Sequence, residues 1–386
     1  MTLRLLFIGD PAAIHVQRWV RYFAQTGHEV HLVPYPDSFS AVAQGTFEGV
    51  HIHKGEFRRR MKNWRGFYSK YLIVENIFRV RRLLSQNEFD LLHAHYISAC
   101  GWTGAWTGFH PFVLTAWGSD VNVDPYRSPF YQYLTRLAIR RADLITANSN
   151  DLKKKLIALG ADQNKIRVIQ GGLELEKFPF QRGNDLLRRQ LGLREEKVVL
   201  STRMLGQVYN LDIVVKSIPL VRAEVPEIKF IFIYRGTQEQ EKELRKLVQE
   251  LGVSDVALLM GPVDNNRIAE YYHLADIFVS VASSEGMPGS LTEAMACGAV
   301  PIVSDLPFVK EWIRPNINGL VVPVRNANTL AQAIVTLLRD PQKRMTMAQR
   351  NRELVVKQAD HRMWMKQVEQ IYRELSHWRG KAVIGN

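Results

Sequence analysis

The feature that most constrains the fold is an alternation of short apolar runs with amphipathic stretches that runs through the first half of the chain and then starts again. Helical or turn-forming sequence follows each run, which is the rhythm of a doubly wound parallel sheet. In the first half the runs are residues 3–8, 30–33, 91–95, 112–116, 144–147 and 166–169. In the second half they are residues 198–201, 228–234, 256–260, 277–281, 300–303 and 320–322. The sequence therefore predicts an α/β protein with two Rossmann-like parallel sheets.

The length of 386 residues fits two domains better than one. We predict a first domain over residues 1–183, a second over 184–359 and a last helix over 360–386. One face of that helix is apolar, and we expect it to pack across both domains. Ligands of such sheets bind beyond the carboxyl ends of the strands, so two facing sheets predict an active site in the cleft between them.

Composition points to a reducing compartment and away from a membrane-spanning or secreted protein. Cys100 and Cys297 lie in apolar segments without zinc-site spacing or a disulfide framework. Apolar runs such as residues 294–304 fall short of the roughly 20 residues that a bilayer-spanning helix needs. Residues 5–9 are too few for the core of a signal peptide. We predict a cytoplasmic protein, with peripheral attachment to the inner face of the plasma membrane as an alternative.

The formal charge of +13 is concentrated in one segment. Residues 54–82 hold ten basic and two acidic residues, a net charge of +8. Cationic and aromatic side chains together suit an anionic bilayer surface. A solvated helix packed on the sheet is an equal alternative, and no nucleic-acid-binding motif accompanies the segment. The residues of the proposed membrane surface are Arg58, Arg59, Arg60, Lys62, Trp64 and Arg65.

The most informative stretch is residues 283–298, which read SSEGMPGSLTEAMACG. It follows the predicted strand 277–281 and enters a helix near Ser290, so its glycine-rich turn presents free backbone N–H groups, as a diphosphate site requires. Glu285 lies in the loop and Glu293 lies one to two turns into the helix. The two carboxylates are therefore staggered, and they suit hydroxyl groups at two positions along one ligand.

Two glutamates separated by seven residues and followed by Ala-Met-Ala-Cys-Gly resemble the donor-site motif of family 4 retaining glycosyltransferases. Weaker matches lie in the expected order along nearly the whole chain: GHEV at 27–30, AD at 142–143, STR at 201–203 and NGLVVP at 318–323. The resemblance implies the GT-B fold and transfer of a sugar from a nucleoside-diphosphate donor with retention of configuration.

The resemblance also implies roles for individual residues. Glu285 would hold hydroxyls of the donor sugar and Glu293 those of the ribose, while the backbone amides of Gly289 and Ser290 would bind the diphosphate. The sequence contains no Asp-x-Asp metal motif, so we assign neutralisation of the departing diphosphate to Arg203 and backbone donors, and expect neither a metal nor a cofactor.

Two positions depart from the family pattern on the donor side. Six residues after the arginine, the family usually has lysine and then glycine, whereas this chain has Tyr209 and Asn210. We retain both as donor-binding candidates. Arg235 follows the strand predicted over 228–234 and is our candidate to replace the missing lysine.

In the first domain, residues 115–120 resemble the family's Thr-x-His-Gly-x-Asp segment, but Trp117 stands in place of the histidine. The hydrogen bond that the histidine would make to the donor is then absent or supplied by a neighbour, and Asp120 is the preferred candidate, which we class as catalytic. His15 and His95 follow strand ends and are the other candidates. With Trp117 they form the predicted acceptor side.

The function predicted for the chain is transfer of a sugar to a glycan or lipid-linked acceptor in cell-envelope or exopolysaccharide synthesis. A nucleotide-sugar epimerase of the same architecture and a non-catalytic nucleotide-sugar-binding protein are the alternatives. A Rossmann oxidoreductase is disfavoured because no Gly-x-Gly-x-x-Gly follows the first strand.

Overall fold

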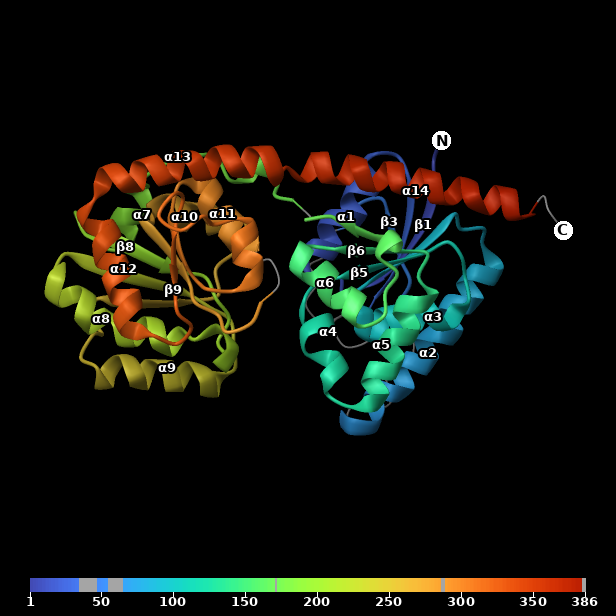
Figure 1. Cartoon of the computed structure of the whole chain (residues 1–386), viewed down its shortest axis with the longest axis horizontal. Coiled ribbons are helices and arrows are strands. Elements are labelled where there is room, and N and C mark those ends of the chain that lie inside the picture. Colours follow the sequence, from blue (N-terminus) through green and yellow to red (C-terminus); the bar gives the residue numbers. More distant parts are fainter. Residues whose placement is uncertain (35–46, 55–64, 171, 286–288, 384–386) are drawn as a thin grey trace. The chain divides into compact units, whose positions relative to one another are not determined.

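The computed structural model describes residues 1–34, 47–54, 65–170, 172–285 and 289–383. It divides the chain into two compact units, which Figure 1 shows. Unit 1 comprises Met1–Gly171 and Arg362–Asn386, and unit 2 comprises Gly172–His361. Each is a parallel sheet flanked by helices on both faces, so the predicted fold class is confirmed.

Unit 1 has seven strands in the order β3-β2-β1-β4-β5-β6-β7. The strands are β1 (Arg4–Gly9), β2 (Glu29–Pro34), β3 (Val50–Ile52), β4 (Leu91–His95), β5 (Phe112–Ala116), β6 (Leu144–Ala147) and β7 (Ile166–Val168). The helices are α1 (Ile14–Gln25), α2 (Arg65–Gln86), α3 (Trp102–Thr107), α4 (Ser119–Asn122), α5 (Pro129–Arg141), α6 (Asn150–Ala158) and α14 (His361–Val383). Short turns of other helical types are η3 (Ile97–Gly101), η4 (Asp124–Tyr126) and η5 (Gln163–Lys165).

Unit 2 has six strands in the order β10-β9-β8-β11-β12-β13. The strands are β8 (Lys197–Ser201), β9 (Ile228–Ile233), β10 (Ala257–Gly261), β11 (Ile277–Ser280), β12 (Val300–Ser304) and β13 (Leu320–Val322). The helices are α7 (Asp185–Gln190), α8 (Leu211–Glu224), α9 (Gln238–Glu250), α10 (Ile268–Leu274), α11 (Gly289–Cys297), α12 (Ala327–Arg339) and α13 (Pro341–Gln358), with short turns η6 (Leu175–Lys177), η7 (Gln207–Tyr209) and η8 (Pro307–Glu311).

Side-chain alternation along the buried strands builds a core on each face of each sheet. In β1, Leu5 and Phe7 pack with α1 and α14. Leu6 and Ile8 point the other way and pack with α2, α3 and α5. A strand buried on both faces must be apolar throughout, which is why these strands are continuous apolar runs in the sequence.

Three features differ from the sequence prediction or extend it. Strand β3 was not predicted, because the middle one of its three residues is a histidine and the strand forms no apolar run. Residues 172–183, which we grouped with the first domain, lie in unit 2, where Leu173 and Phe178 are buried in its core. In α14, Met365, Val368 and Tyr372 are fully buried in unit 1. The prediction that this helix also crosses the second domain stays a prediction.

Candidate functional site

In each sheet two neighbouring strands send their following connections in opposite directions. In unit 2 these strands are β8 and β11, and in unit 1 they are β1 and β4. Such a switch point leaves a crevice at the carboxyl ends of the strands, where ligands of open α/β sheets bind. Most of the predicted site residues lie in the segments that follow these four strands or in the neighbouring β5 connection.

At the switch point of unit 2 the structure brings Arg203, Glu285 and Ser290 together. Arg203 lies two residues beyond β8, and its guanidinium makes a close ion pair with the Glu285 carboxylate. Another guanidinium nitrogen, Nη1, donates to Ser290 Oγ at 2.8 Å. The side chains of Arg203 and Glu285 are only 9% and 15% exposed. The buried Nε of Arg203 has no partner among the described residues, so one N–H donor remains unused.

The second glutamate of the motif is held by a tyrosine that the sequence analysis did not identify. Tyr272 is fully buried in α10 and donates its hydroxyl to Glu293 Oε2 at 3.2 Å. Its oxygen also lies 3.1 Å from Thr202 Oγ1, in the segment that leaves β8. Burial, followed by the nearby Glu293 charge, raises the pKa of the Tyr272 hydroxyl well above its usual value, so it stays a proton donor. No motif marks this tyrosine, because it comes from a helix outside the glycine-rich segment.

The remaining donor-side candidates have different surroundings. Asn210 is fully buried, adopts a left-handed backbone conformation (φ 52°) and donates to Val281 O at 2.8 Å and Ser283 Oγ at 2.7 Å. It therefore clamps the β8 connection to the segment after β11. The Tyr209 ring lies 4.9 Å from the guanidinium carbon of Arg203, a cation–π contact. Arg235 is exposed just beyond β9, and Gly289 is exposed at the start of α11.

In unit 1 the predicted acceptor residues form an aromatic cluster. The ring of His15 lies 4.0 Å from that of Trp117, and the Trp117 ring lies 5.9 Å from that of His95. Burial lowers the pKa of His15 to about 4 and that of His95 well below its usual value, so both rings are neutral at neutral pH. Neither ring nitrogen of His95 has a hydrogen-bond partner among the described residues.

Asp120 is completely buried and organises this cluster through the backbone. Its carboxylate accepts N–H groups from Gly118 at 2.8 Å, Ile97 at 2.9 Å and Trp117 at 3.1 Å. Burial raises the pKa of Asp120 to about 6, although these N–H groups act in the opposite direction. The carboxylate thus fixes the segment carrying Trp117 to the exit of β4. That exit is strained, because Tyr96 has a φ of 83°.

The basic segment falls largely outside this description. Arg58, Arg59, Arg60, Lys62 and Trp64 lie outside the described residues, as does the side chain of Arg65. Further along α2, Val74 and Phe78 are 49% and 66% exposed. Within the described part of the chain, no helix combines the length and apolar character that crossing a membrane requires.

Several known proteins are similar to this chain over most of its length. N-acetyl-alpha-D-glucosaminyl L-malate synthase of Bacillus anthracis is 23% identical over 92% of this chain and 91% of its own. D-inositol 3-phosphate glycosyltransferase of Kribbella flavida is 23% identical over 79% of this chain and 74% of its own. Anabaena HepE, solved in complex with UDP, matches with a TM-score of 0.80 and 18% identity over 97% of this chain and 100% of its own. Sucrose-phosphate synthase of Thermosynechococcus elongatus matches with a TM-score of 0.80 and 21% identity, over 96% of this chain and 99% of its own.

These structural matches identify the fold as GT-B. Two family models match separate parts of the chain. Residues 4–149 match the model described as glycosyl transferase 4-like, and residues 184–354 match the model described as glycosyl transferases group 1. Both halves give the same answer, and the chain belongs to the group 1, family 4-like glycosyltransferases.

Proposed function

We propose that this glycosyltransferase moves a sugar from a nucleoside-diphosphate sugar, bound at the switch point of unit 2, with retention of configuration and without a metal or cofactor. The observation that carries the proposal is the contact of Arg203 with Glu285 and Ser290 where β8 and β11 end. A buried cation beside a helix start is suited to a diphosphate. The UDP and UDP-glucose complexes of HepE support this donor class.

The roles follow from the charges that the reaction creates. Breaking the bond between the anomeric carbon and the phosphate oxygen leaves negative charge on the departing diphosphate. We assign its neutralisation to Arg203, the Ser290 hydroxyl and the backbone N–H groups at the start of α11. Because Arg203 is buried, its charge acts through a medium less polar than water, where such stabilisation is strongest.

The two glutamates hold the donor at separate points. Glu285 accepts from the sugar hydroxyls, and Glu293, oriented by Tyr272, accepts from the ribose hydroxyls. In a front-face reaction the acceptor oxygen bonds to the anomeric carbon on the side that the diphosphate leaves. The acceptor proton passes to the departing phosphate oxygen, so no enzyme nucleophile is required. A trapped covalent glycosyl-enzyme would contradict this route.

We propose that unit 1 supplies the acceptor side through His15, Trp117 and His95. Asp120 then acts as a positioning residue, because its oxygens are occupied by backbone N–H groups. The names of the two relatives contain different small molecules, L-malate and D-inositol 3-phosphate, so they select no single acceptor for this chain. We infer a glycan or lipid-linked acceptor in cell-envelope or exopolysaccharide synthesis, chiefly because a basic segment precedes the exposed apolar residues of α2.

That acceptor assignment places the protein at the cytoplasmic face of a membrane, and vesicle binding tests it. We expect co-sedimentation with vesicles containing anionic lipid, weakened by Phe78→Ser and by neutralisation of Arg58, Arg59 and Arg60 together. Leu186→Ser is the control, since Leu186 is similarly exposed, at 62%, in unit 2. Co-sedimentation that depends neither on anionic lipid nor on these substitutions would refute membrane attachment.

The catalytic proposal is tested with a panel of nucleoside diphosphates and nucleotide sugars. A bound donor should raise the melting temperature by mass action, and the same donor should be hydrolysed slowly without acceptor and consumed faster with glycan or lipid-linked acceptors. Glu285→Gln should abolish turnover. Glu270→Gln is the matched control, because Glu270 also pairs with an arginine, Arg267, but on the surface.

The alternatives give different products in this assay. Conversion of a free nucleotide sugar to its epimer would identify an epimerase and refute glycosyl transfer. Donor binding without consumption, across the acceptor panel, would identify a binding protein. Retention is read from the anomeric configuration of the product.

A further inference from the structure

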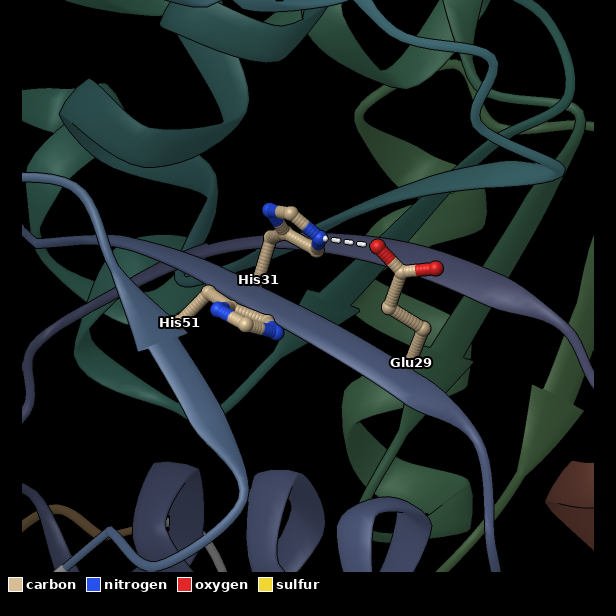
Figure 2. A group of neighbouring side chains, drawn as sticks. All are labelled: Glu29, His31 and His51. Carbon is tan, nitrogen blue, oxygen red and sulfur yellow. Dashed lines mark hydrogen bonds and ion pairs between the residues drawn. The ribbon is translucent and has the colours of Figure 1, made fainter.

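A second cluster of chemically active side chains lies in unit 1, at the edge of its sheet and away from the switch point. Strands β2 and β3 are parallel neighbours, and β3 is the last strand of the order. His31 of β2 and His51 of β3 are register partners. Glu29 precedes His31 by two residues, so it lies on the same face of the sheet. Figure 2 shows these three side chains gathered above the two strands.

The distances within the cluster are short enough for coordination of one ion. His31 Nε2 lies 2.9 Å from Glu29 Oε1. The ring centres of His31 and His51 are 4.7 Å apart. One ligand atom from each of the three residues can be chosen so that all lie within 4.8 Å of one another. Since His51 is exposed, its ring can rotate to bring its nitrogen closer.

We propose that Glu29, His31 and His51 form a binding site for a divalent transition-metal ion, with Zn²⁺ as the ion that the ligands suit best. Two imidazoles and one carboxylate are ligands that Zn²⁺ accepts at about 2.0–2.2 Å, commonly with water as the fourth ligand. The hard ions Mg²⁺ and Ca²⁺ prefer sites made of oxygen.

A fourth residue orients the central ligand. His53 Nε2 lies 2.8 Å from His31 Nδ1, and the two rings stack with centres 5.1 Å apart. If His31 coordinates through Nε2, its Nδ1–H donates to His53, an arrangement that fixes the tautomer and direction of a metal-binding histidine. Phe89 packs edge-on against His31 with ring centres 5.0 Å apart, which limits its movement further.

The contacts of Glu29 leave one of its carboxylate oxygens directed at the cluster. Arg4 Nε occupies Glu29 Oε2 at 2.7 Å and leaves Oε1 facing His31. The carboxylate thus offers one oxygen to the ion.

The site would join two strands that otherwise share only a short ladder. Strand β3 has three residues and covers one edge of the sheet. Ligands from both β2 and β3 would make removal of β3 from the sheet require loss of the ion. The predicted consequence is structural, because none of these residues belongs to the proposed transfer machinery.

Cobalt and zinc binding to the full-length, tag-free protein tests the proposal. We expect one Co²⁺ per chain, detected by visible ligand-field absorption and displaced by one Zn²⁺, with Zn²⁺ also raising the melting temperature. His51→Ala should lower the affinity at least 100-fold. His53→Phe should lower it about 10- to 100-fold, the effect typical of losing an outer partner.

The matched control is His110→Ala. His110 also pairs with a carboxylate, through Nδ1 and Asp143 Oδ2 at 2.7 Å, and belongs to no three-residue metal cluster found among the described residues. His110→Ala should leave the affinity for the metal ion unchanged. Both His51→Ala and His110→Ala should fold, because both histidines are exposed. Absence of stoichiometric binding to the wild type, or equal affinity in His51→Ala, would overturn the proposal.

Discussion

The two switch points share one topology but carry side chains of different kinds. In unit 2 the crevice residues are charged and paired, with Arg203 contacting Glu285 and Ser290. In unit 1 the predicted acceptor residues are aromatic, and the two histidines are neutral because burial lowers the pKa of His15 and His95. The strand order thus gives a switch point in both units, and the residues just beyond the strands decide its chemistry. This contrast is consistent with our proposal that the first holds the diphosphate and the second the acceptor.

The largest expected effect comes from removing the cation of unit 2. Arg203→Ala should lower kcat/KM for transfer by about 10²- to 10³-fold, the cost typical of losing a donor to developing negative charge. It also leaves the Glu285 carboxylate without its partner. Steady-state kinetics with the donor found in the panel measure the loss.

Arg222→Ala is the control for this change. Arg222 pairs with Asp255 at 2.8 Å on the surface of the same unit, where ion pairs contribute little. Activity of Arg203→Ala within a few-fold of wild type would show that the contrast between the two crevices is irrelevant to transfer.

The next effect concerns Asp120, a fully buried carboxylate in the connection that follows β5 of unit 1. Burial raises its pKa from 3.8 to about 6, so the folded chain holds a proton there that the unfolded chain has released. The contribution of Asp120 to the free energy of unfolding is therefore complete below about pH 4 and is lost as the pH rises through about 6. This difference in pKa corresponds to roughly 3 kcal/mol.

Asp120→Asn removes this titration. Denaturant unfolding at several pH values should show the wild type losing stability relative to the variant between about pH 4 and 6. A constant difference between the two proteins across this range would mean that the carboxylate is not buried as described.

A third prediction compares two histidines of one strand. His93 Nε2 lies 2.6 Å from Thr115 Oγ1, and its Nδ1 lies 2.5 Å from the Tyr372 hydroxyl of α14. His93→Phe should destabilise unit 1 by about 2 kcal/mol, because both buried hydroxyls lose a partner. His95→Phe should preserve or raise the stability, because neither of its nitrogens has a partner within the described residues.

The transfer activity of His95→Phe then decides whether His95 takes part in acceptor binding. If His95→Phe raises the melting temperature and lowers transfer, the ring nitrogens are kept for the acceptor at a cost in stability. If it changes neither, His95 is a packing residue and the acceptor side is confined to His15 and Trp117.

The sequence predicted the fold well where burial requires a distinctive pattern. All twelve apolar runs form strands, because a strand covered on both faces must be apolar throughout. Strand β3 was missed for the same reason, since none of its three residues is fully buried and its middle residue is His51. The metal cluster was missed with it, because only the register of β3 against β2 brings His51 to His31.

The donor-side contacts were only partly predictable. Arg203, Glu285 and Ser290 follow strands that the sequence shows clearly, and their roles as donor ligands stay predictions. Tyr272 could not be found, since a tyrosine in an ordinary helix carries no local sign of the residue it faces. For Asn210 the position was predicted but the contacts were not. Its hydrogen bonds to the segment after β11 depend on the tertiary structure.

The smallest predicted effect sharpens the comparison within unit 2. Tyr272→Phe removes the hydroxyl that donates to Glu293 and leaves the ring in place. We expect the KM for the donor to rise about 5- to 10-fold with kcat little changed, because one hydrogen bond of about 1 kcal/mol orients a ligand of the ribose and not of the reacting bond. Tyr271→Phe removes the same atom one residue earlier and serves as the control. A fall in kcat with unchanged KM would place Glu293 at the reacting centre and merge two roles that the staggered carboxylates separate.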